Sequence, residues 1–133
     1  MNNMYFNKVI LLGSIASDII YTSSSGDGVS TLFLATNRKW KDRAGVKKEQ
    51  STYHKVVFFG QMAELIKTMG KRGEHLMVEG RLQHREYEDI DRVKRKDIII
   101  VCEKFILGSE KFEKDKVEIN EDLINKQLEE WDI

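Results

Sequence analysis

One segment with helical spacing of its apolar residues interrupts an otherwise strand-like sequence. The position of this segment is the feature that most constrains the fold. Residues 61–69 place Met62, Leu65, Ile66 and Met69 at helical spacing, and Gly70 follows as a stop signal. The segments around this helix are rich in β-branched and aromatic residues, which favour strands. Three such segments precede the helix and two follow it: residues 6–21, 29–40, 52–60, 75–82 and 97–107.

This order of elements predicts an all-β fold, the OB-fold. That fold is a five-stranded Greek-key barrel with one helix between strands 3 and 4, and it binds oligonucleotides across strands 2 and 3. Gly13 indicates a bulge or a close backbone approach within the first strand. Asp27-Gly28 is a hairpin signal between the first two strands. We expect a charged loop over residues 41–50 and a polar connection over residues 86–96.

The net charge of zero conceals two oppositely charged parts of the chain. Residues 1–108 carry 18 Lys+Arg against 13 Asp+Glu, whereas residues 109–133 carry 4 against 9. Such asymmetry is typical of a basic binding domain with an acidic tail. The sequence therefore predicts an OB-fold domain over residues 1–108 and a short acidic C-terminal tail over residues 109–133, flexible or partly helical.

Several classes of protein are disfavoured by what the sequence lacks. No apolar run approaches the roughly 18 residues that span a membrane. Cys102 is the single cysteine, which excludes an internal disulfide and fits a reducing cytoplasm; its apolar neighbours predict burial. The histidines His54, His75 and His84 lack metal-ligand spacing, and neither a phosphate-binding loop nor a nucleophile elbow is present. We expect no cofactor, no metal and no catalysis.

Aromatic residues beside cations are the strongest candidates for a binding surface. Trp40 stands among four cations, and burying it would draw them out of water, so we interpret it as a stacking platform rather than a ring packed on its own surface. Alternation along the third strand places Tyr53, Lys55, Val57 and Phe59 on one face.

Tyr87 follows two arginines and repeats this chemistry, although a partly buried tyrosine at a strand end is the alternative. We expect the phosphate contacts of a bound strand to come from the neighbouring cations, which are Arg38, Lys39, Lys41, Arg43, Lys47, Lys48, Lys55, Arg81 and Arg85.

Three segments in order, residues 7–13, 35–42 and 49–64, resemble the bacterial single-stranded DNA-binding protein family, and the resemblance extends over about residues 5–108. It implies that Trp40, Tyr53, Phe59 and Tyr87 stack on DNA bases. It also implies sequence-independent protection of single-stranded DNA in replication, recombination and repair. Tyrosine stands at two positions where the family often has tryptophan, and Glu86 stands where a basic residue is common.

Two apolar runs indicate self-association. Residues 8–12 and 56–59 lack polar alternation, which predicts apolar surface on both sides of the sheet. The family resemblance implies that subunits pair into a homotetramer, and we expect at least a homodimer.

The C-terminal residues leave two interpretations open. The chain ends in acid beside apolar residues, and the resemblance implies that replication and repair proteins bind there, through Trp131, Asp132 and Ile133. The alternative is a short helix capped by Asn120, with Leu128 and Trp131 on one face. For the whole chain, the rival functions are an OB-fold replication or restart accessory protein acting through protein contacts, and an RNA-binding OB domain.

Overall fold

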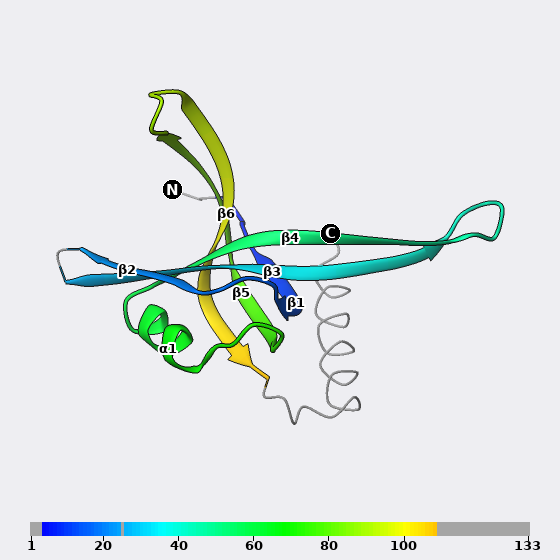
Figure 1. Cartoon of the computed structure of the whole chain (residues 1–133), viewed down its shortest axis with the longest axis horizontal. Helices are drawn as coiled ribbons and strands as arrows, with labels where there is room; N and C mark the ends of the chain where they lie inside the picture. Colours follow the sequence, from blue (N-terminus) through cyan, green and yellow to red (C-terminus); the bar gives the residue numbers. More distant parts are fainter. Residues whose placement is uncertain (1–3, 25, 109–133) are drawn as a thin grey trace.

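The computed structural model describes residues 4–24 and 26–108, which form a strand-dominated domain with one helix (Figure 1). The expected tail, residues 109–133, lies outside the described residues. In chain order the elements are β1 (Val9–Ile15), β2 (Ile20–Ser24), β3 (Asp27–Lys41), β4 (Lys47–Phe59), α1 (Gln61–Met69), β5 (His75–Glu88) and β6 (Lys94–Leu107).

The strands close into a barrel. Their order in the sheet is β1-β5-β6-β4-β3-β2, and additional pairing of β1 with β3 closes the barrel, with β2 continuing beyond β3. Neighbours pair antiparallel except β4 and β6, which meet in parallel through Val56↔Ile100 and Val57↔Val101. With α1 between β4 and β5, this is the OB-fold, and the fold prediction is confirmed.

The first expected strand, residues 6–21, divides into β1 and β2. β1 pairs with β3 up to Ile15↔Leu34, and pairing resumes at Ile20↔Thr31. Residues 16–19 therefore oppose only two residues of β3, Leu32 and Phe33, as in an enlarged β-bulge. The break lets one long strand bend around the barrel while its two halves keep β3 as a partner.

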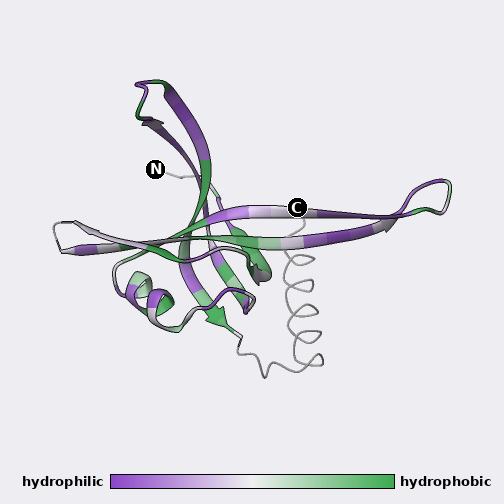
Figure 2. Cartoon of the chain, viewed as in Figure 1, coloured by the Kyte–Doolittle hydropathy of each residue, from purple (hydrophilic) through white to green (hydrophobic). Residues whose placement is uncertain are grey.

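The expected loops at residues 41–50 and 86–96 are present but shorter, because about half of each segment is strand. β3 and β4 continue to Lys41 and Lys47, and β5 and β6 continue to Glu88 and Lys94. Both ribbons project from the barrel and are hydrophilic where they leave it (Figures 1 and 2). Because water reaches both faces of such a ribbon, its sequence loses the apolar–polar alternation that identifies a half-buried strand.

The core fills the barrel and the space beneath α1. Its fully enclosed side chains include Leu34, Phe58 and Leu76 from the strands and Ile66 from the helix. Ser30 Oγ donates a hydrogen bond of 2.7 Å to the carbonyl oxygen of Ala63, which ties α1 to β3. No helix in the described part of the chain is long and apolar enough to cross a membrane.

Two predicted details of the core are confirmed. An added Cβ at Gly13 would overlap the backbone carbonyl of Ala35, so this glycine permits the close approach of β1 and β3. Cys102 is buried, and burial raises the pKa of its thiol to about 12, so the group is neutral and unreactive at physiological pH.

Candidate nucleic-acid interface

The β3–β4 register separates the side chains of these strands into two faces. The pairs Ala35↔Tyr53, Phe33↔Lys55 and Val29↔Phe59 share the face turned away from the barrel interior, here called the outer face. On it Tyr53 is 63% exposed and Phe59 is 47% exposed. The sheet therefore presents two aromatic rings to solvent with a cation between them.

β5 and β6 extend the same outer face. Because Val57 pairs with Val101, and Val101 pairs with Arg81, these three residues lie on one face of the sheet. Successive alternate positions of β5 then place Arg85 and Tyr87 there as well. The Arg85 guanidinium carbon lies 5.7 Å from the centroid of the Tyr87 ring, which is 44% exposed.

A small buried apolar cluster lies in the middle of the outer face. Val57 of β4 packs with Ile99 and Val101 of β6, and all three are buried although they face away from the main core. Val57 therefore lies on the same face as Tyr53 and Phe59, as predicted. Unlike those two rings, its side chain is buried. Along β4 this small apolar cluster lies between the positions of Tyr53 and Phe59.

Asp97 links two of the expected phosphate-binding cations. Its carboxylate accepts hydrogen bonds from Lys55 Nζ at 3.0 Å and from Arg85 Nε and Nη2 at 3.1 and 2.8 Å. The hydrogen bond from Arg85 is the main cause that lowers the pKa of Asp97, and Lys55 adds to it. The three groups carry a net charge of about +1, so the centre of the outer face attracts anions less strongly than two free cations would.

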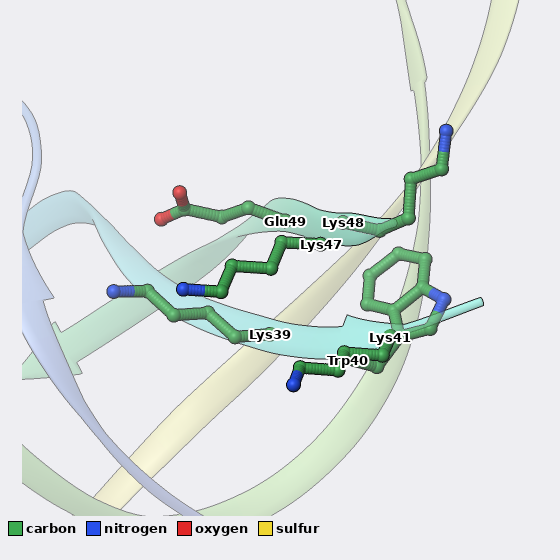
Figure 3. Close-up of a pocket in the computed structure, with 6 residues that line it drawn as sticks. All are labelled: Lys39, Trp40, Lys41, Lys47, Lys48 and Glu49. Atoms are coloured by element: carbon green, nitrogen blue, oxygen red, sulfur yellow. The ribbon is translucent and has the colours of Figure 1, made fainter. Parts of the chain in front are cut away.

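Trp40 lies on the other face of the β3–β4 ribbon. It pairs with Lys48, and it stands an odd number of residues from Phe33 and Ala35 along β3. The Arg38 guanidinium carbon lies 4.9 Å from the centroid of its ring. Figure 3 shows the ring beside Lys48, with Lys39 and Lys47 extending away from it. The structure thus groups Tyr53, Phe59 and Tyr87 on one face and places Trp40 on the opposite face of the β3–β4 ribbon.

The far end of the β3–β4 ribbon is the most basic part of the interface. A hollow of about 510 Å³ is lined there by Lys39, Trp40, Lys41, Lys47, Lys48 and Glu49. Within the described residues, ion pairs are made by none of the cations near it: Arg38, Lys39, Lys41, Arg43, Lys47 and Lys48. Asp42, the nearby acid, instead accepts the backbone N–H groups of Ala44 and Val46. The β5–β6 ribbon differs, because Arg95 and Lys96 are each paired with an acid.

Comparison with known families decides what this barrel is. Residues 6–107 match the model of the single-strand binding protein family. The chain belongs to that family.

Solved single-strand binding proteins share the fold. A Plasmodium falciparum SSB, solved in complex with ssDNA, is 27% identical with a TM-score of 0.72; the match covers 82% of this chain and 100% of that one. A deletion variant of the single-stranded DNA binding protein from Thermus aquaticus is 25% identical with a TM-score of 0.70. That match covers 80% of this chain and 52% of that one.

The sequence interpretation missed two residues of the outer face. In the sequence Asp97 is only the first residue of the expected strand 97–107, and the pairing of β5 with β6 is what places it beside Arg85. Phe33 is 41% exposed on the outer face, and alternation with the buried Leu32 and Leu34 was a signal that could have identified it.

The remaining residues discussed in the sequence analysis lie as follows. His54 lies against Thr36 Oγ1 at 2.9 Å, and burial lowers the pKa of its imidazole. Residues 4–24 and 26–108 hold no cluster of His, Cys, Asp or Glu suited to a metal ion. Trp131, Asp132 and Ile133 lie outside the described residues.

Proposed function

We propose that this single-strand binding protein holds single-stranded DNA with little sequence preference and does not react with it. The observation that carries the proposal is the joining of exposed rings and unpaired cations on one barrel. Tyr53, Phe59 and Tyr87 are exposed on the outer face, and six cations of the β3–β4 ribbon make no ion pair within the described residues. Every base has a π-face and every nucleotide a phosphate, so this combination binds any unpaired strand.

The arrangement favours an unpaired strand over a duplex. Bases within a duplex are stacked on each other, and their faces are not available to protein rings, whereas single-stranded bases can be splayed onto aromatic side chains. In this proposal Trp40, Tyr53, Phe59 and Tyr87 stack on bases. The phosphates are neutralised by the cations of the β3–β4 ribbon and by Lys55, Arg81 and Arg85. The Plasmodium falciparum protein, whose structure contains ssDNA, supports single-stranded DNA as the ligand.

A fluorescence titration tests the proposal. Trp131→Phe leaves Trp40 as the only tryptophan, so its emission reports directly on the β3–β4 ribbon. Oligo-dT should quench this emission, and log K should fall with log salt with a slope of about −0.7 per phosphate contact. Trp40→Ala should weaken binding by the roughly 1–3 kcal/mol of one stacked base. Unchanged emission and salt-independent affinity would contradict the proposal, and tighter binding to RNA or duplex DNA would redirect it.

Self-association into a homotetramer is the second part of the proposal. β1 has an open edge over residues 9–13, where it pairs with β5 on one side while β3 reaches only Ser14 and Ile15. Beside this edge the solvent-facing side carries partly exposed apolar residues of three strands: Ile10, Leu12, Met77 and Ile106. An unpaired edge next to apolar surface is suited to pairing with a second copy of the chain.

We further propose a cytoplasmic role in DNA replication, recombination and repair, with the acidic C-terminus recruiting partner proteins. The single buried, unreactive Cys102 supports a reducing compartment. Deleting residues 121–133 tests whether this segment is separate from the DNA-binding domain. DNA affinity should stay equal or rise slightly at low salt, because an acidic segment that competes for the cations is removed. Loss of folding on deletion would show instead that this segment belongs to the domain.

A further inference from the structure

Phe33 is an aromatic residue on the outer face that the proposed function leaves unused. It directly opposes Lys55 in the β3–β4 register and is 41% exposed, while its chain neighbours Leu32 and Leu34 are 1% and 0% exposed. Burying a phenylalanine fully is worth about 1.5–3 kcal/mol, and this ring gains only part of that. Packing within the subunit therefore does not account for a phenylalanine at this position.

The break between β1 and β2 keeps the ring open to solvent on one side. Phe33 lies opposite the bulged residues 16–19, so no β1 or β2 residue pairs with it in strand register. Its backbone is nevertheless fixed at both ends. The Phe33 N–H donates to Ser17 Oγ at 2.8 Å, and the Phe33 carbonyl accepts from the Ala16 N–H at 2.8 Å. The result is an exposed ring on a rigid backbone.

The cation on the opposite side of Phe33 leaves the ring uncovered. Lys55 Nζ is held at 3.0 Å from Asp97 on β6, and β6 lies on the far side of β4 from β3. The ammonium group is therefore drawn away from Phe33. Within the described residues, cations cover the rings of Trp40, Tyr21 and Tyr87, but none covers Phe33.

The position of Phe33 fits between two rings of the proposed base-binding surface. Its partner Lys55 stands two residues from Tyr53 and four from Phe59 along β4, which corresponds to about 7 Å and about 14 Å at 3.4 Å per residue. All three rings point from the same face of the sheet. A strand that stacks on Tyr53 and on Phe59 must pass this point.

We propose that Phe33 is a further base-stacking residue, which takes the nucleobase lying between those on Tyr53 and Phe59. The inference rests on the proposed single-stranded DNA binding. Because phenylalanine has no polar side-chain atom, this subsite accepts any base and contributes affinity without sequence preference.

The test compares Phe33→Leu, which keeps apolar volume and removes the ring, with Phe33→Tyr, which keeps the ring. Binding to oligo-dT should weaken by about fivefold to about 140-fold in Phe33→Leu, since one stacked base contributes about 1–3 kcal/mol and about 1.4 kcal/mol is tenfold. Phe33→Tyr should bind like the wild type. The salt slope should be the same in all three proteins, because no phosphate contact is lost. Thermal melting checks that both variants fold.

A second ligand separates base stacking from an indirect effect. On an abasic oligonucleotide, which has the phosphates but no bases, Phe33→Leu and the wild type should bind equally. Equal binding of the two proteins to oligo-dT would overturn the inference. So would an equal loss on both ligands, or a lower assembly mass in Phe33→Leu, because the ring would then contact a second copy of the chain. Failure of the wild type itself to bind oligo-dT would overturn the proposed function instead.

Discussion

Asp97 shows how a single residue can moderate a binding surface. It faces solvent on a basic face, and its carboxylate holds Lys55 and Arg85 together between Tyr53 and Tyr87. From sequence, the rings and cations could be identified one by one, because alternation and composition reveal them. Their shared acid could not, because its two partners lie 42 and 12 residues away in the chain and meet it only through strand register.

Asp97→Asn should bind single-stranded DNA more tightly at low salt. Removing the carboxylate raises the local charge by one unit, so the slope of log K against log salt should steepen by about 0.7, equivalent to one more phosphate contact. Glu86→Gln is the matched control, because Glu86 lies on the opposite face of the same ribbon, paired with Lys96, and loses the same charge. Weaker binding by Asp97→Asn would mean that the carboxylate chiefly positions the two cations.

The same residue makes stability depend on pH. The pKa of Asp97 is lowered from its ordinary value of 3.8, mainly by the hydrogen bond from Arg85. A lowered carboxyl pKa contributes stability that is fully present above the unfolded-state pKa and is lost as pH falls through the folded-state pKa. The stability difference between wild type and Asp97→Asn should therefore shrink below about pH 4. Urea unfolding at several pH values measures this, and a constant difference would contradict it.

At the scale of elements, the two projecting ribbons end in the same turn. In each, an aspartate accepts two backbone N–H groups with Oδ1, and the fourth residue has positive φ: Asp42 with Gly45 at 79°, and Asp89 with Arg92 at 60°. This is the three-residue hairpin loop that ends in a left-handed residue. The sequence predicted the strands and the helix, but it did not predict these turns, because one has arginine at the position where glycine marks the other.

This difference predicts opposite effects of two substitutions. Arg92→Gly should stabilise the domain by up to about 1 kcal/mol, because the left-handed conformation costs a non-glycine residue about 1–2 kcal/mol and glycine's extra chain entropy offsets part of the gain. Gly45→Arg should destabilise it by a similar amount. Urea unfolding of both variants measures the effects, and shifts in the same direction would show that backbone strain does not control these turns.

At the scale of the whole molecule, closure of the barrel still leaves an unpaired strand edge beside apolar side chains. The pairing of β1 with β3 covers only Ser14 and Ile15, so most of β1 keeps a free edge. Residues 8–12 predicted this apolar surface, because they carry apolar side chains on both faces of the strand. The sequence could not show which edge stays open, because that depends on where the first strand breaks.

Assembly through β1 is therefore the last prediction. Light scattering of the wild type at micromolar concentration should give a multiple of the 15.5 kDa chain mass. Ile10 points away from the core, because it pairs with Glu79 while Leu11 pairs with the buried Val78. Ile10→Lys should consequently lower the mass without unfolding the barrel, since a charge beside a paired copy would have to leave water. Leu65→Lys, at an exposed apolar position on α1, should leave the mass unchanged. A wild-type mass of 15.5 kDa would show that a single barrel tolerates this edge and its apolar surface unaided.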